Sequence, residues 1–229
     1  MESFLATKCP RCSRLEFWKT AGKRLKCKKC RYVFTPRPNP LNLSSKILEQ
    51  VVSEFILEHS TKIISERVNI SKYKLFKLLT LLRKLMTNVG AQKEFVPIKQ
   101  PIIGIICRGG KFFAEIIPNI EAKNLKSLFK KESPVPESLE KYSGLAFKGS
   151  IHRLFPKEKK EYRISALEGF WGYLKRKLAA KGGVRREKLP LYLGEYSWRY
   201  NHRKLTLKEQ EKHLLNLVFQ YFKSNGKDI

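Results

Sequence analysis

The sequence predicts a multidomain α/β protein: a small metal-binding module, a three-helix module, and a mixed α/β domain that ends in helices. Three observations predict this architecture. Two CxxC motifs stand fourteen residues apart near the start, residues 44–88 follow helical periodicity, and from residue 92 the pattern changes to strands. We place the domains at residues 1–38, 39–90 and 91–223, followed by a tail at 224–229.

The charge of the chain points to a polyanionic partner. Lys and Arg number 48 against 20 Asp and Glu, a formal net charge of +28, while a hydrophobic content of 42% permits a packed core. Nucleic acid is the first candidate, because neutralising phosphates releases counterions, and an anionic membrane is the second. No apolar run approaches the ~20 residues of a spanning helix and no signal segment opens the chain. We expect a soluble protein of the cytoplasm or nucleoid (the nucleus in a eukaryote), with no membrane partner.

The first module carries the strongest motif. Four cysteines form its two knuckles: Cys9, Cys12, Cys27 and Cys30. Two CxxC units at this separation are typical of a four-thiolate zinc site, and a site filled by four cysteines is structural because no coordination position stays open. Disulfides or a redox CxxC are the alternatives. Zinc is favoured because four cysteines form two CxxC pairs and because the sequence shows no secretory signal. Residues 15–19 and 24–26 read as short strands of a basic zinc ribbon, whereas Cys107 stands alone in an apolar run.

Residues 44–88 predict three helices. The first ends near residues 59–60, a short one is capped by Thr61, and a turn at 69–71 precedes a longer helix capped by Ser71. A short turn before a basic last helix is typical of a helix-turn-helix, and the alternative is a plain three-helix bundle with a solvated charged face. Our candidate groove and phosphate contacts, at the start of the last helix, are Lys72, Tyr73, Lys74 and Lys77.

The third domain opens with strands. Residues 102–107 form a continuous apolar run, as in a strand covered on both faces, and residues 108–111 read as the turn to a returning strand at 112–117. The remaining expected elements are a strand at 94–98, a helix at 119–130, a short helix at 139–145, a strand at 147–152, and helices at 165–180, 187–202 and 206–223.

The helix near residue 167 combines an acid with cations. Ser165 followed by Glu168 reads as a capping box, and Thr206 with Glu209 reads as another. Helical spacing gives a buried face that includes Leu167 and Leu174, and it places Trp171 and Lys175 on the side of Glu168. Taken alone, this is a capped amphipathic helix with a basic end.

The order of these elements resembles the DDE transposases of insertion sequences related to the Merlin elements. Four segments carry the resemblance: 102–119, 142–152 (with Tyr142-Ser143-Gly144-Leu145), 167–178, and 195–203 (Glu195-Tyr196-Ser197-Trp198-Arg199-Tyr200-Asn201-His202-Arg203). The resemblance spans residues 8–203 and implies a truncated RNase H-like domain. In that family three carboxylates bind two Mg²⁺ ions that cut and join DNA, and carboxylates are ligands that Mg²⁺ prefers.

The resemblance also implies site residues. Glu168 stands at the third acidic position, and Glu94 and Glu137 are the only candidates for the first two, where the family has Asp. The only Asp of the chain is Asp228, so a site of two Asp and one Glu cannot form and the catalytic site is degenerate. Mg²⁺ is implied only if the site is catalytic, and whether the chain is an enzyme stays open.

The implied partner is double-stranded DNA that carries inverted repeats, and the resemblance implies that the protein binds it as a homodimer. The implied DNA contacts beside the acids and on the closing helix are Lys175, Arg176, Lys177, Arg199, Asn201 and Arg203. Three functions follow: a transposase-family DNA-binding protein for DNA transposition, a non-catalytic or domesticated DNA-binding regulator, and a basic RNA-binding zinc-ribbon protein.

Overall fold

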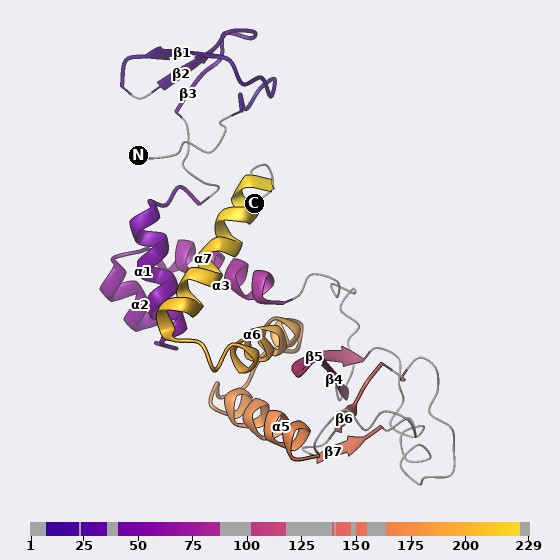
Figure 1. Cartoon of the computed structure of the whole chain (residues 1–229). Helices are drawn as coiled ribbons and strands as arrows, with labels where there is room; N and C mark the ends of the chain where they lie inside the picture. The colour runs from indigo at the N-terminus through magenta and orange to yellow at the C-terminus, as the bar shows by residue number, and fades with distance from the viewer. Residues whose placement is uncertain are drawn as a thin grey trace. The chain divides into compact units, whose positions relative to one another are not determined.

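The computed structural model describes residues 8–22, 24–35, 41–87, 102–117, 139, 141–147, 150–154 and 164–224 (Figure 1). Within these residues the chain is mixed α/β, with six α-helices and two small antiparallel sheets. It divides into two compact units: unit 1 is Met1–Leu82 with Leu207–Ile229, and unit 2 is Arg83–Thr206. The expected strand at 94–98 and the expected helix at 119–130 lie outside the described residues.

Residues 8–35, which we call the four-cysteine module, form a three-stranded antiparallel sheet. Its strands are β1 (Phe17–Thr20), β2 (Arg24–Cys27) and β3 (Val33–Phe34), in the order β1-β2-β3. The two expected strands are confirmed, and the third is too short to show alternation. Among the described residues of the module only Cys9 and Cys27 are buried, so the sheet has almost no apolar core.

The other described helices of unit 1 are α1 (Ser45–Ile56), α2 (Thr61–Val68), α3 (Lys72–Met86), whose last residues from Arg83 belong to unit 2, and α7 (Leu207–Ser224). The first three match the helices expected from periodicity, but α2 is capped by Ser60 and not by Thr61, which is its first helical residue. Each begins after a serine whose hydroxyl accepts a backbone N–H: Ser44 from Ile47 at 3.3 Å, Ser60 from Ile63 at 3.3 Å, and Ser71 from Lys74 at 3.4 Å. These caps satisfy N–H groups that a helix start leaves without an intrahelical partner.

Helix α7 belongs with the N-terminal helices and not with the third domain, where we expected residues 206–223. It packs against α1 and buries Leu214, Val218 and Phe222. Thr206 immediately precedes it, as the second expected capping box requires. Its apolar stripe shows that one face is buried, but periodicity does not reveal which element covers that face.

The sheet of unit 2 has the order β5-β4-β6-β7 and is antiparallel throughout. Its strands are β4 (Ile102–Arg108), β5 (Lys111–Ile117), β6 (Gly144–Phe147) and β7 (Ser150–Arg153). The hairpin β4–β5 was expected. The short helix expected at 139–145 is wrong: Gly144 already begins β6, and a second hairpin replaces the single strand expected at 147–152.

Both faces of this sheet are covered, as the apolar run at 102–107 predicted. On one face Ile103, Ile105 and Cys107 pack with residues of α5 (Ile164–Ala179) and α6 (Leu189–Asn201). On the other face Ile102 packs with Leu139, Tyr142 and Leu154. Gly104 is required beneath Tyr142, because a Cβ there would lie 2.3 Å from the tyrosine ring. Strand β4 is therefore the centre of the unit 2 core.

Candidate metal centre and nucleic-acid interface

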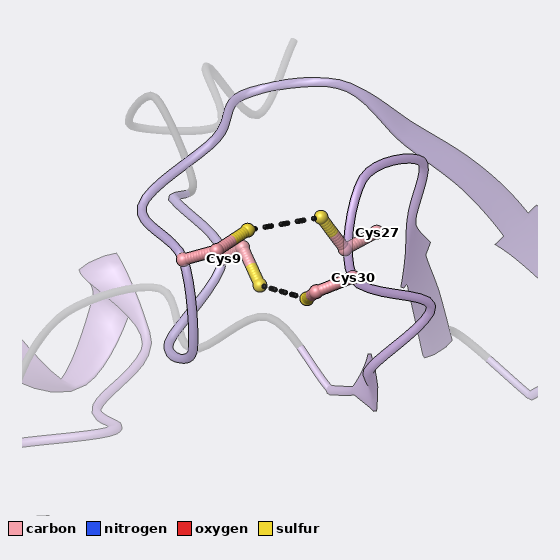
Figure 2. A group of neighbouring side chains, drawn as sticks. Cys9, Cys27 and Cys30 are labelled. Atoms are coloured by element: carbon pink, nitrogen blue, oxygen red, sulfur yellow. Dashed lines mark hydrogen bonds between the residues drawn. The ribbon is translucent and has the colours of Figure 1, made fainter.

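The four cysteines of the two knuckles converge on one point. All four Sγ atoms lie within 4.8 Å of one another, and the separations of Cys9 from Cys30 and of Cys12 from Cys27 are both 3.5 Å. Figure 2 shows Cys9, Cys27 and Cys30 pointing toward a common centre between the two loops. All are free thiols, because a disulfide would hold its sulfurs at about 2.05 Å.

The two knuckles repeat the same backbone hydrogen bonds. The N–H of Cys9 donates to the carbonyl of Arg14 and the N–H of Ser13 donates to Cys9; likewise Cys27 donates to Tyr32 and Arg31 donates to Cys27. In each knuckle the residue after the second cysteine is left-handed, with φ of 58° at Ser13 and 61° at Arg31. This left-handed residue turns the chain sharply, so that both thiols of a knuckle face the same side.

The electrostatics of the cluster favour a cation at its centre. The backbone N–H of Cys30 lowers the pKa of the Cys27 thiol to about 6, against the opposing effect of burial. At Cys30 the backbone N–H of Tyr32 acts to lower the pKa, but burial and the thiols of Cys9, Cys12 and Cys27 raise it to about 12. One thiolate therefore forms easily and then resists the ionisation of its neighbours, which is the repulsion that a divalent cation removes.

The arrangement fits a tetrahedral metal ion. Four Zn–S bonds of about 2.3 Å at tetrahedral angles separate the sulfurs by about 3.8 Å, which lies between the 3.5 Å and 4.8 Å found here. The four cysteines predicted from spacing thus form a cluster that could hold a metal such as zinc. A metal bound by four thiolates would hold the module together and leave no coordination position for substrate.

The second candidate surface lies on α2 and α3. Asn69 ends α2 in the left-handed conformation, Ile70 is buried, and Ser71 caps α3, so the helices are joined by a three-residue turn. The hydroxyl of Ser65 donates to the carbonyl of Ile70 at 2.8 Å and fixes this turn. The connection between the two helices is therefore short and is held by a hydrogen bond to its backbone.

The exposed side of α3 combines aromatic rings with cations. Tyr73 is 68% exposed and Phe76 is 54% exposed, and Lys72 and Lys77 are exposed beside them. The Lys77 ammonium lies 4.7 Å from the centre of the Tyr73 ring, whereas Lys74 is half-buried. We call Lys72, Tyr73, Phe76 and Lys77 the α3 face. Sequence reasoning missed Phe76, although its position three residues after Tyr73 puts both rings on one side of the helix.

Helix α5 departs from the sequence expectation at its start. It begins at Ile164, so Ser165 lies inside its first turn and cannot be the N-cap partner of Glu168. The boundary misleads because serine is common both at caps and in first turns. Trp171, expected on the side of Glu168, is buried in the core, whereas Glu168 is exposed.

The basic end of α5 lies at the surface. Lys175 and Arg176 are exposed and Lys177 is half-buried. The Lys175 ammonium lies 5.8 Å from the centre of the Trp171 ring, and the Lys177 ammonium lies 5.8 Å from the Tyr173 ring. The other two candidate acids, Glu94 and Glu137, lie outside the described residues, so the structure does not bring the three carboxylates together or separate them.

Helix α6 uses two expected DNA contacts for internal structure. Asn201 accepts from the N–H of Phe112 and donates to its carbonyl, both at 2.8 Å, and Ser197 accepts from the N–H of Ala114 at 3.1 Å. These side chains satisfy backbone groups of β5, which is an edge strand and would otherwise expose them. Arg199 is buried, and its Nε lies 3.0 Å from the carboxylate of Glu195. Arg203 is exposed and lies 3.9 Å over the Tyr200 ring.

Glu195 joins two arginines inside unit 2. It is 3% exposed, and its carboxylate also lies 2.8 Å from Nε of Arg83. The Arg83 guanidinium rests 4.5 Å from the centre of the Tyr192 ring. Sequence reasoning did not single out Arg83, because its partner stands more than a hundred residues later in the chain.

Comparisons with known proteins return no match: no family model, no curated protein and no solved structure matches the chain. Within the described residues no helix combines the length and the apolar content that crossing a bilayer requires.

Proposed function

We propose that this chain binds double-stranded DNA through α2 and α3 acting as a helix-turn-helix, with the four-cysteine module as a second, zinc-held contact. The observation that carries the proposal is the α3 face. Two large aromatic rings at 68% and 54% exposure cost free energy in water, and they lie between two exposed lysines on a helix that follows a short, fixed turn. In a major groove lysines contact phosphates and apolar side chains contact thymine methyl groups.

Charge supports the same partner. A formal net charge of +28 suits a polyanion, and exposed cations also occur on α5 and on the four-cysteine module. The α3 face supplies the proposed groove contact.

We further propose that the chain descends from the DDE transposases that it resembles. Its DNA target would then be the inverted repeats of an insertion sequence. The order of elements supports this descent: a four-cysteine module, a helix-turn-helix, a β-hairpin, and a helix bearing an exposed glutamate, Glu168, before a cluster of cations. Because the Asp ligands are absent, we propose a DNA-binding protein whose strand transfer is lost or weak. Displacing a catalytic carboxylate by ~1 Å can lower the reaction rate about a hundredfold.

The test is the salt dependence of duplex binding by the full-length, zinc-loaded protein. Lys72→Ala with Lys77→Ala removes two phosphate contacts, and we expect the slope of log K against log salt to fall by about 2. Fluorescence anisotropy with a short labelled duplex of random sequence measures this slope.

The matched control is Lys208→Ala with Lys212→Ala on α7, which removes the same charge from exposed positions of the same unit. Equal effects of the two double variants would mean that net charge, and not the α3 face, drives binding. Nicking or joining of inverted-repeat DNA in Mg²⁺, lost in Glu168→Gln, would show in addition that the acids still act.

A further inference from the structure

The sheet of the four-cysteine module has two unlike faces. Register places Phe17 opposite Cys27 and Leu25 opposite Phe34, and the Phe17 and Phe34 rings meet edge to face at 5.4 Å. These residues form the side that carries Cys27. The opposite side carries Trp18, which pairs across the sheet with Lys26, which in turn pairs with Val33. We call this second side the Trp18 face.

The Trp18 face leaves a large apolar area uncovered. Trp18 is 41% exposed and Val33 is 44% exposed, although the module has almost no core of its own to bury. A tryptophan in so small a module would be expected in its interior, because it is the largest apolar group available. Its place on the outer side of the sheet indicates a binding surface rather than a packing role.

Cations surround this ring. The Arg31 guanidinium lies 4.8 Å from the centre of the Trp18 ring, and Lys26 and Arg24 stand on the same side of the neighbouring strand. Between residues 8 and 35 the chain has ten Lys or Arg and one acid, Glu16. A Zn²⁺ ion with four thiolates carries about −2, so the module stays strongly positive when loaded.

We propose that the Trp18 face binds an unpaired nucleobase of a single-stranded nucleic acid. The base stacks on the Trp18 indole, while Lys26 and Arg31 contact the phosphates on either side of it. An indole beside a guanidinium suits this ligand, because every base presents a flat π surface and every nucleotide carries a negative charge. Base-paired nucleotides are excluded from such a contact, since their faces are already stacked. This site is separate from the duplex contact proposed for α3, and it assigns the second contact, that of the four-cysteine module, to nucleotides that are not base-paired.

The structure also supplies the reporter for a test. Trp171 and Trp198, the other two tryptophans, are each only 7% exposed, so Trp18 is the exposed tryptophan of the chain and can be followed by excitation near the red edge of tryptophan absorption. We titrate full-length, zinc-loaded protein with oligo-dT, with oligo-U and with a duplex of equal length. Oligo-dT and oligo-U share the unpaired base and distinguish a DNA strand from an RNA strand. Acrylamide quenching first identifies the part of the tryptophan emission that comes from exposed Trp18. We expect nucleic acid to quench this part, and single strands to quench it more strongly than the duplex.

Trp18→Leu is the decisive variant. It keeps an apolar side chain but removes the stacking surface, and we expect single-strand affinity, measured by anisotropy, to fall about five- to a hundredfold. Arg31→Gly removes the guanidinium while suiting the left-handed backbone, and we expect the salt slope to fall by about 1. Leu15→Ala is the matched control: Leu15 is 56% exposed in the same module but lies before β1, and its loss leaves binding unchanged.

Zinc content close to that of the unmodified protein verifies that each variant is folded. The proposal is overturned if Trp18→Leu binds oligo-dT and oligo-U with the same affinity as the unmodified protein. It is also overturned if both strands saturate the unmodified protein without any change in its tryptophan emission. Stronger quenching by the duplex overturns it too, because the face would then contact a paired backbone. Loss of duplex binding in the α3 variants leaves this site untouched, so the two proposals fail separately.

Discussion

The four-cysteine module and unit 2 are both built on an antiparallel sheet, but only unit 2 buries its sheet between apolar side chains. In the module only two cysteines are buried among the described residues, whereas β4 of unit 2 is packed on both faces. The module gains its order from four thiols that converge on one point, and unit 2 gains its order from apolar area removed from water. The difference leaves the module's outer face free for binding.

The largest expected effect is the loss of the metal. A structural four-cysteine zinc site supplies about 10–16 kcal/mol of binding free energy, so we expect a strong chelator, or Cys12→Ser, to unfold residues 8–35 and leave unit 2 intact. Hydrogen exchange measured by mass spectrometry compares the two regions in one experiment, and elemental analysis should find about one zinc per chain. Retained protection of β1 and β2 after chelation would contradict a metal-held module.

Glu195→Gln should have the next largest effect, confined to unit 2. It removes the buried carboxylate that forms ion pairs with Arg83 and Arg199, and we expect unit 2 to lose about 3–5 kcal/mol of unfolding free energy. Denaturant unfolding followed by buried tryptophan fluorescence measures the loss, and zinc content should stay constant. Glu187→Gln, at an exposed position of the same unit, is the control that should cost almost nothing. Equal stability of the two variants would mean that the buried ion pairs of Glu195 do not stabilise unit 2.

Gly104→Ala tests the packing of β4. A Cβ at this position would meet the Tyr142 ring at 2.3 Å and the Ile117 side chain at 2.8 Å, so we expect a loss of about 1–3 kcal/mol in thermal or denaturant unfolding of unit 2. Gly169→Ala in α5 is the opposite case, because its Cβ meets nothing closer than 3.6 Å and alanine favours a helix by about 1 kcal/mol. If the Gly104 variant were as stable as the Gly169 variant, the Tyr142 ring would be able to move and accommodate the added methyl group without cost.

The smallest expected effect is in a knuckle. Ser13 is left-handed with φ of 58°, and Ser13→Gly should relieve this strain and strengthen zinc binding by about 0.5–1 kcal/mol. Competition with a chromophoric zinc chelator measures the change. Ser13→Ala keeps the strain, and a gain from it equal to that from glycine would show that backbone conformation is not the cause.

How far the sequence predicted these features depends on the distance over which each signal acts. The knuckles, the Ser71 cap of α3 and the β4–β5 hairpin depend on residues close in the chain, and all were predicted, whereas the cap of α2 is Ser60 and not the expected Thr61. Helix α7 was assigned to the wrong unit, and the Arg83–Glu195 pair was missed, because neither periodicity nor composition reveals which distant surfaces meet. The error at 139–145 has a local cause: Leu139 and Tyr142 have helical spacing, but they pack on the sheet from a turn that leads into β6.

The measurement that tests the central claim most directly is the reactivity of individual lysines with and without duplex DNA. Full-length, zinc-loaded protein is acetylated briefly at low reagent concentration, and peptide mass spectrometry quantifies Lys72, Lys77, Lys208 and Lys212, all of which are exposed in the free protein. DNA binding through the α3 face predicts that duplex protects Lys72 and Lys77 and leaves Lys208 and Lys212 as reactive as before. Equal protection of all four lysines, or none at Lys72 and Lys77, would contradict it.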